Sequence, residues 1–150
     1  MYSRQEASGW RKKFWTSFGQ YMQPLQGAGG RPVNWLNYKT GIRHLYFRMD
    51  ADNKKAGIGI ELHHADPLVQ GQYFEKLRQL KSILEHSTGE EWDWNRSYTN
   101  EERKPISRIG TTLTGVNLFD TGDWPAIISF LKPRILALDE FWDKVKEGFE

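Results

Sequence analysis

The chain has 150 residues, of which 38% are hydrophobic, 14% aromatic and 27% charged, and it contains no cysteine. This length and apolar content exclude a disordered chain and predict a single domain over residues 1–150. The lack of cysteine excludes disulfide frameworks, thiolate zinc sites and cysteine nucleophiles. The formal net charge of +2 does not by itself indicate a nucleic-acid binder, so local charge clusters have to carry that interpretation.

No part of the sequence resembles a membrane anchor or a cofactor motif. Residues 1–13 carry several charges and lack the apolar core of a signal peptide, and no stretch approaches the roughly 18 apolar residues of a membrane span. The glycine-rich segment at residues 27–30 lacks the lysine of a phosphate-binding loop. We therefore expect a cytoplasmic protein with no membrane partner and no cofactor.

The first half of the chain predicts a helix followed by a β-hairpin. Aromatic residues recur at helical spacing over residues 4–22, and prolines and glycines then mark a flexible connection. Apolar and polar residues alternate on both sides of Asp52-Asn53 within residues 43–62, which predicts two antiparallel strands. With Asp52-Asn53 as the loop, the expected pairs are Met49 with Ala56, Phe47 with Ile58, Leu45 with Ile60, Arg48 with Gly57, Tyr46 with Gly59, His44 with Glu61, and Asp50 with Lys55.

The second half of the chain predicts two helices around a second hairpin. Asp66-Pro67 indicates the start of a helix that Gly89 ends, and Pro133 is expected to kink or divide the last helix. The other elements are a hairpin over residues 91–98 and 105–113 and a final helix over residues 124–149. The order α-ββ-α-ββ-α predicts an α+β fold with two layers, an antiparallel sheet of two β-hairpins and helices packed on one face. One core is expected to contain Phe14, Phe18, Phe47, Ile58, Ile60, Leu77, Leu80, Leu138 and Phe141.

Three stretches of aromatic and turn residues occur in an order typical of one family. They are residues 33–41 (VNWLNYKTG), residues 45–50 (LYFRMD) followed by residues 54–56 (KKA), and residues 123–125 (DWP) with residues 138–142 (LDEFW). From roughly residue 10 onwards, the chain resembles a bacterial family of domains of unknown function that often lies C-terminal to predicted restriction-endonuclease-like domains of the PD-(D/E)XK type. The resemblance implies a link to DNA processing or defence, and it brings no catalytic residues with it.

The residues themselves argue against a PD-(D/E)XK site in this chain. Such a site needs an aspartate and an acidic-x-Lys motif around one metal ion. The nearest carboxylates, Asp50 and Glu61, would lie roughly 20 Å apart in the expected register. His44, Glu61 and His63 form a better candidate metal site, because all three would project from one face at the open end of the hairpin and suit zinc or a similar ion. The alternative is a polar cross-strand pair on a solvated face.

A candidate binding surface follows from the same hairpin. Tyr46 and Arg48 are expected opposite two glycines, which leaves either a ring folded across Gly59 or a shallow surface suited to stacking and anion contact. Two basic pairs lie at the hairpin tips, which could point the same way, although most charge runs are solvated faces. The candidate surface therefore comprises Tyr46, Arg48, Lys54, Lys55, Arg103 and Lys104.

Two functions from different classes follow from these residues. The favoured one is a non-catalytic binding or accessory module that contacts a protein or nucleic-acid partner through the exposed aromatic and basic residues of the sheet, with a homodimer as a possible assembly. The alternative is a metal-dependent hydrolase or nuclease-related enzyme that uses His44, Glu61 and His63. Asp139-Glu140 on the final helix is expected to be a solvated pair rather than an acid-base dyad.

Overall fold

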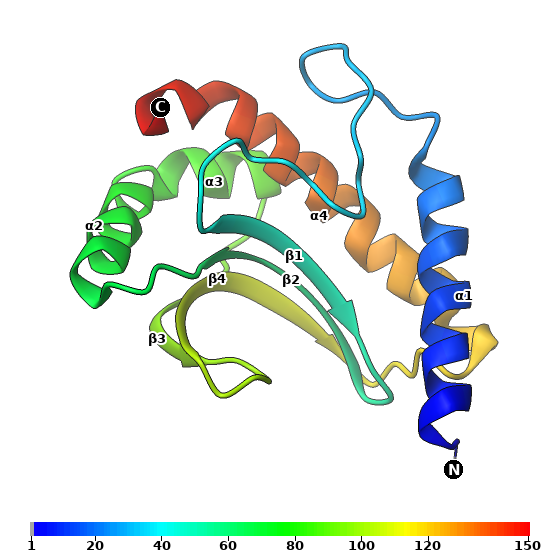
Figure 1. Ribbon diagram of the computed structural model, residues 1–150. Helices are drawn as coiled ribbons and strands as arrows, with labels where there is room; N and C mark the ends of the chain where they lie inside the picture. The colour runs from blue at the N-terminus through cyan, green and yellow to red at the C-terminus, as the bar shows by residue number, and fades with distance from the viewer. Residues whose placement is uncertain (1) are drawn as a thin grey trace.

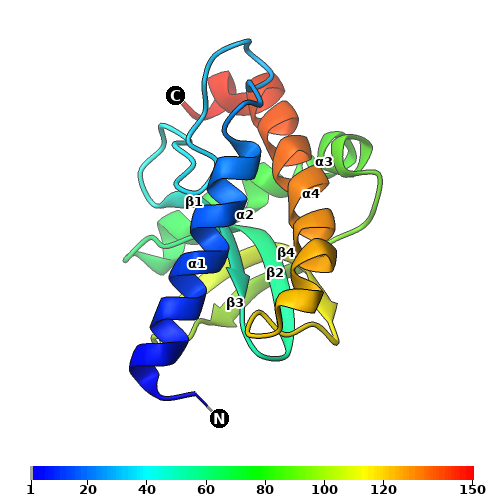
Figure 2. The same cartoon turned by 90° about the vertical axis from the view of Figure 1, so that its right-hand side faces the viewer.

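The computed structural model describes residues 2–150 and shows a four-stranded antiparallel sheet with helices packed on one face (Figures 1 and 2). The elements are α1 (Arg4–Met22), β1 (Leu45–Ala51), β2 (Lys55–Leu62), α2 (Pro67–Arg78), α3 (Lys81–Thr88), β3 (Asp93–Thr99), β4 (Pro105–Thr114) and α4 (Trp124–Val145), with short 3-10 turns at Thr121–Asp123 and Lys146–Phe149. The strand order in the sheet is β1-β2-β4-β3. The predicted α+β fold of two β-hairpins with helices on one face is confirmed. Within the described residues, no helix is both long and apolar enough to cross a membrane.

The first helices begin at side-chain caps that the sequence carries. Ser3 accepts a hydrogen bond from the Glu6 amide at 3.1 Å and caps α1, and Asp66 accepts one from the Leu68 amide at 2.9 Å and caps α2. Pro67 occupies the first turn of α2, where a missing N–H costs nothing. The predicted helix start at Asp66-Pro67 is therefore confirmed.

The helix predicted to run from Pro67 to Gly89 is divided into α2 and α3. The Leu80 amide donates to the Leu77 carbonyl at 2.9 Å, which is a tighter turn than that of an α-helix, and the chain changes direction there. No proline or glycine marks this break, so local sequence patterns do not predict it. Gly89 adopts a left-handed conformation, with φ at 74°, and ends α3 as predicted.

The last helix, α4, is not divided at Pro133, contrary to one expectation. It runs through this residue for 22 residues in total. Leu131 before the proline and Ile135 and Leu138 after it are all fully buried. Packing on both sides of Pro133 keeps the two halves in one helix, although the proline removes one backbone donor. Figure 2 shows α4 beside α1 on the helical side of the sheet.

The predicted register of the first hairpin is wrong by two residues. Phe47 pairs with Ile60 rather than Ile58. The observed pairs are Leu45 with Leu62, Tyr46 with Glu61, Arg48 with Gly59, Met49 with Ile58, Asp50 with Gly57, and Ala51 with Ala56. The cause lies in the turn, because the Asp52 carboxylate accepts hydrogen bonds from the amides of Lys54 and Lys55 at 2.8 and 2.9 Å. A shift of two residues preserves which side chains share a face, so the predicted core face is still correct.

The predicted core is confirmed for all but one of its residues. Phe14, Phe18, Phe47, Ile58, Ile60, Leu77, Leu138 and Phe141 are buried in one cluster. Leu80 is only partly buried and packs against that cluster, because the break between α2 and α3 turns it away from the core.

The long connection between α1 and β1 is fastened to α4 by hydrogen bonds. The Asp139 carboxylate accepts from the Ala28 amide at 2.6 Å and from the Tyr38 hydroxyl. The Trp142 indole donates to the Thr40 carbonyl at 2.8 Å. Asp139 is only 6% exposed, so the expectation that it belongs to a solvated pair is wrong. It is a structural residue that holds the connection over the core.

Candidate binding site

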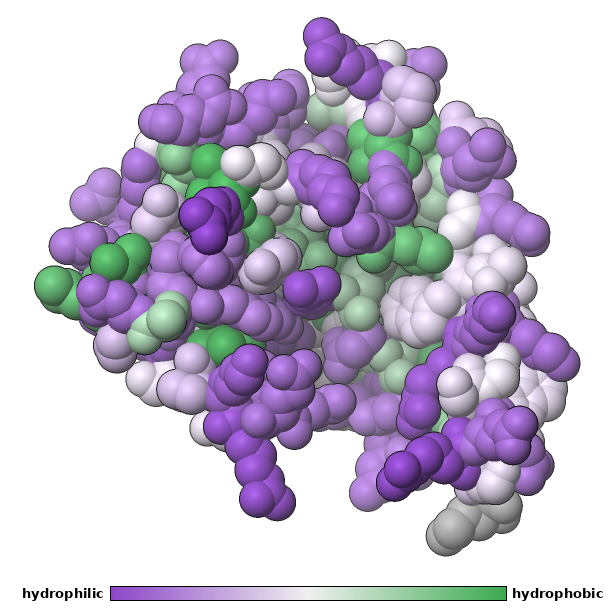
Figure 3. All heavy atoms as spheres, in the orientation of Figure 1, coloured by the Kyte–Doolittle hydropathy of each residue, from purple (hydrophilic) through white to green (hydrophobic). Residues whose placement is uncertain are grey.

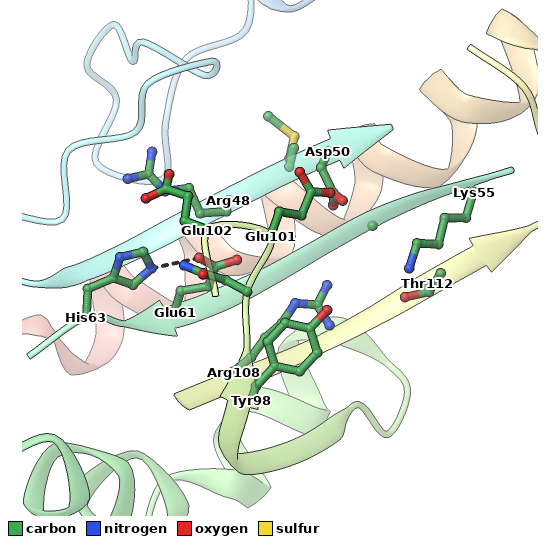
Figure 4. A pocket seen from close by; sticks show the side chains of 13 residues that line it. Arg48, Asp50, Lys55, Glu61, His63, Tyr98, Glu101, Glu102, Arg108 and Thr112 are labelled. Carbon is green, nitrogen blue, oxygen red and sulfur yellow. Dashed lines mark hydrogen bonds and ion pairs between the residues drawn. The ribbon is translucent and has the colours of Figure 1, made fainter. Parts of the chain in front are cut away.

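The face of the sheet that carries no helix, here called the open face, consists of alternate residues of the strands. Its residues are Tyr46, Arg48, Asp50, Gly57, Gly59, Glu61, Tyr98, Arg108, Gly110 and Thr112. A hollow of about 430 Å³, here called the open-face hollow, lies over this surface. Figure 4 shows side chains from β1, β2 and β4 pointing into it. The helices bury the other face, so a partner of the sheet has this face to contact.

The loop between β3 and β4 closes one side of the open-face hollow. The Asn100 side chain accepts a hydrogen bond from the Lys104 amide at 2.8 Å, and Arg103 adopts a left-handed conformation with φ at 62°. This tight turn brings Glu101 and Glu102 over β1 and β2, where both line the hollow (Figure 4). The loop thereby adds carboxylates to a surface that sequence analysis describes as basic and aromatic.

The β1–β2 and β3–β4 connections leave the sheet from opposite ends, and the β3–β4 loop then folds back over the open face. Strands β2 and β4 are antiparallel, with Lys55 opposite Thr114 and Leu62 opposite Ser107. The β1–β2 tip therefore lies at the Lys55 end of β2, whereas the β3–β4 loop starts from the other end. The reason is the pairing of β2 with β4, which local patterns do not show.

The structure brings only part of the predicted binding surface together. Arg48 and Lys55 line the open-face hollow, and Arg48 lies over the Tyr46 ring at 4.3 Å from its centroid. Lys54, Arg103 and Lys104 are exposed at the hairpin tips and lie outside the hollow. Tyr46 lies opposite Glu61, so it does not fold across Gly59 as one interpretation expected.

The side chain that covers the glycines is Arg108 of β4, which the sequence analysis missed. A Cβ atom on Gly57 would lie 3.2 Å from Nη2 of Arg108, one on Gly59 would lie 3.4 Å from Nε, and one on Gly110 would lie 2.6 Å from Cζ. A Cβ atom on Gly57 would lie closer still to the Asp50 carboxylate, at 2.6 Å, and one on Gly59 closer to the Ile109 carbonyl oxygen, at 2.8 Å, so the glycines make room for these groups as well as for the guanidinium group. Alternation in β4 predicts that Arg108 lies on the open face. Its position beside the glycines of β2 follows only from the pairing of β2 with β4, which the sequence does not show.

Three cationic side chains line the hollow without an ion-pair partner among residues 2–150, namely Arg48, Lys55 and Arg108. Arg108 is half-buried and donates one long hydrogen bond, to the Ile58 carbonyl at 3.4 Å. Its guanidinium carbon also lies 5.6 Å from the centre of the Tyr98 ring. Most donors of these cations are therefore free to bind an incoming group.

Asp50 has an unusual environment at the β1 side of the hollow. Withdrawal of its carboxyl from water by the surrounding protein raises the pKa of Asp50 above its ordinary value, although part of the residue remains exposed. The negative charges of Glu101 and Glu61 raise this pKa further, whereas Arg108 lowers it. A carboxyl group with a perturbed pKa in a hollow is typical of functional sites.

The predicted metal set of His44, Glu61 and His63 is only partly assembled. His63 Nε2 lies 2.8 Å from Glu61 Oε1, and this pair reaches the hollow. His44 adopts a left-handed conformation with φ at 67°, which breaks the alternation of the strand, and its ring lies 5.2 Å from that of His64. No group of three histidine, aspartate or glutamate residues within residues 2–150 has an arrangement that could hold a metal ion.

His64 makes the stability of the fold sensitive to acid. Its Nδ1 atom is buried with no hydrogen-bond partner among the described residues, and its ring stacks on Tyr73 at 4.5 Å. Desolvation, followed by the charges of His44 and His63, lowers the pKa of His64 below its ordinary value of 6.5. The unfolded chain therefore binds the proton first as the pH falls, so the free energy of unfolding decreases below about pH 6.5.

We expect the His64→Phe variant to lose stability less steeply than the wild type between about pH 7 and pH 5. Phenylalanine keeps the stacking partner of Tyr73 and cannot titrate. Urea unfolding at a series of pH values measures the difference. Parallel pH profiles for the two proteins would show that His64 does not contribute.

Comparison with known proteins identifies the family but no characterised relative. The sequence matches the family model described as "Domain of unknown function (DUF4268)" over residues 10–146. No curated protein and no solved structure matches the chain. The matched range contains all four strands and every residue that lines the open-face hollow. The chain therefore belongs to the DUF4268 family, in agreement with its predicted resemblance to a family of domains of unknown function.

Proposed function

We propose that this domain is a non-catalytic binding module that takes an extended segment of a partner protein in the open-face hollow. The observation that carries the proposal is the set of three cations without ion-pair partners, Arg48, Lys55 and Arg108, around one hollow on an uncovered sheet face. Charged groups that are free of internal partners are suited to complementary charges on another molecule.

The charge pattern of the hollow favours a protein over a nucleic acid. Four carboxylates, those of Asp50, Glu61, Glu101 and Glu102, line the hollow together with the three cations. A phosphate backbone carries one sign of charge and would be repelled by these carboxylates, whereas a protein segment can present both signs. Figure 3 shows hydrophilic side chains over much of the surface in this view, with hydrophobic side chains between them in several patches.

The resemblance noted from the sequence supplies the cellular setting of the proposal. The family that the chain resembles often lies beside predicted restriction-endonuclease-like domains, so we place the partner among bacterial proteins of DNA processing or defence, in the cytoplasm. A direct contact with DNA is the competing outcome. The hydrolase alternative is not supported by a specific feature, because His44, Glu61 and His63 do not form a group that could hold a metal ion within residues 2–150.

Selection of random dodecapeptides on a display library, followed by mapping of the bound peptides through backbone amide chemical shifts, tests the proposal. We expect the shifts to cluster on β1, β2 and β4 around the hollow. Selected peptides that map only to other surfaces would overturn the proposal. Oligonucleotides that bind at the hollow, with an affinity that falls steeply with salt, would replace the protein partner with DNA.

The Arg48→Ala variant is expected to bind the selected peptides about tenfold more weakly than the wild type, a change of ~1.4 kcal/mol. Its thermal midpoint should stay nearly unchanged, because Arg48 is exposed and makes no ion pair with residues 2–150. Isothermal titration and thermal unfolding measure the two effects. Arg31→Ala is the matched control, since Arg31 is exposed and lies outside the hollow, and it should leave the affinity unchanged.

A further inference from the structure

We infer that Arg108 is the anchor of the open-face hollow and binds the side-chain carboxylate of an aspartate or glutamate in the partner segment. The inference rests on the proposed function and adds the chemistry of the group that is recognised. It is carried by the geometry around Arg108, which differs from that of the other cations of the hollow.

The Arg108 side chain lies over glycine positions of β2 and β4. Its side chain runs from β4 across the glycine positions of β2, and Gly110 leaves its Cζ and Nη1 atoms a space that a Cβ would enter to 2.6 Å. Glycine in a strand interior weakens the strand relative to a residue with a side chain. The absence of side chains at Gly57 and Gly110 leaves the guanidinium group its room over the sheet.

The donors of Arg108 match a carboxylate. A guanidinium group has several N–H donors in a planar fork, and here one long bond to the Ile58 carbonyl at 3.4 Å is formed. No carboxylate of residues 2–150 lies within ion-pair distance of Arg108. A planar carboxylate can take two parallel N–H···O bonds from this fork, and such bidentate pairs are among the stronger hydrogen bonds in proteins.

The surroundings select a single carboxylate over a phosphate group. Asp50, Glu61 and Glu101 lie around the same hollow, so each additional negative charge of the ligand is opposed by them. A carboxylate brings one negative charge, whereas a phosphate brings up to two.

The backbone around Arg108 favours a side-chain carboxylate over a chain terminus. Sites that capture a C-terminal carboxylate use free backbone N–H groups. Strand β2 is paired with β1 and with β4 from residue 56 to residue 62, so the amides of this part of the strand are engaged in the sheet. Side-chain donors are therefore what the floor of the hollow offers, and a side chain that projects from an extended segment can reach them.

The test is a titration of the full chain with small probes that differ in one group. N-acetylglutamic acid α-amide presents a side-chain carboxylate, its glutamine counterpart removes the charge, N-acetylalanine presents a terminal carboxylate, and inorganic phosphate presents the competing anion. We expect the Nε–Hε signal of Arg108 to shift with the glutamate probe, and the glutamine probe to bind at least about tenfold more weakly. An equal response to glutamine, or a stronger response to phosphate or N-acetylalanine, would overturn the inference.

Two variants test the shape and the position of the Arg108 guanidinium group separately from its charge. Arg108→Lys keeps the charge but loses the planar fork of donors, so it should bind the glutamate probe about tenfold more weakly than the wild type. Arg31→Lys is the control, because Arg31 is exposed and lies outside the hollow, and it should leave the affinity for the glutamate probe unchanged. Gly57→Ala provides a second variant, because its Cβ would meet only the ends of the Asp50 and Arg108 side chains, which can move without disturbing the backbone. It should fold and bind the glutamate probe more weakly than the wild type does. Unchanged binding by a folded Gly57→Ala would contradict the role of the glycines.

The outcomes for the anchor and for the module are distinguishable. Display-selected peptides that map to the open-face hollow but share no acidic residue would refute the role of Arg108 and leave the binding module standing. Peptides that map elsewhere would refute the binding module, whatever the small probes show.

Discussion

Replacement of Phe47 by alanine is expected to lower the free energy of unfolding by about 3–5 kcal/mol. Phe47 is 6% exposed and lies on the edge strand β1, in the core on the face that the helices cover. Its ring stacks on Tyr38 at 4.9 Å and meets Trp142 edge-on at 5.8 Å. Two contributions add up in this loss. The apolar area of the ring is no longer buried on folding, and a cavity remains between the sheet, α4 and the connection before β1.

Urea or guanidinium unfolding measures this loss directly. Tyr21→Ala is a suitable control, because Tyr21 is an aromatic residue that is 51% exposed, and we expect a change within about 0.5 kcal/mol there. A loss below about 1 kcal/mol for Phe47→Ala would show that the ring does not lie in the core.

Much of the architecture could be predicted because it depends on local patterns. Apolar spacing in α1 correctly placed Phe14 and Phe18 in the core but wrongly put Tyr21 on the same stripe, and alternation in β1 and β2 separated the buried face from the open face. The Asp66 cap and the left-handed Gly89 fixed two helix ends in the same way. The break at Leu80 could not be predicted, since it results from a tight turn without proline or glycine.

The register of the first hairpin shows where alternation stops being informative. A shift of two residues leaves every side chain on its own face, so both registers satisfy the hydrophobic pattern equally. The choice between them lies with the Asp52 carboxylate, which accepts bonds from the Lys54 and Lys55 amides. The loop is consequently Asn53-Lys54, and the difference of one loop position moves Arg48 from Gly57 to Gly59.

The candidate site could be predicted only in part, because some of its residues come together through the pairing of strands that are distant in the sequence. Arg48 and Lys55 belong to the hairpin whose pattern is local, and both line the hollow. Arg108 and Glu101 come from the second hairpin, and only the pairing of β2 with β4 brings them to the same place. Contacts between strands that are distant in the sequence leave no periodic signal in either strand, so the anchor of the site required the structure.

Asp139 shows the same limit on a helix. Its position next to Glu140 on an amphipathic helix suggests a solvated pair, yet its carboxylate binds the connection that starts more than a hundred residues earlier, through Ala28 and Tyr38. Burial, and the hydrogen bond and charge of Asp139, raise the pKa of Tyr38 well above its ordinary value, so this hydroxyl remains a donor.

We expect Asp139→Ala to lower the free energy of unfolding by about 3 kcal/mol, because it removes two hydrogen bonds to a charged acceptor and leaves the Ala28 amide and the Tyr38 hydroxyl without it. Glu140→Ala, at the exposed neighbouring position, should change it by less than about 0.5 kcal/mol. Tyr38→Phe combined with Asp139→Ala should cost less than the sum of the single changes, since both remove the same bond. Faster hydrogen exchange at Ala28 in Asp139→Ala would place the loss in the connection before β1, and exactly additive single and double variants would show that Asp139 and Tyr38 are not coupled.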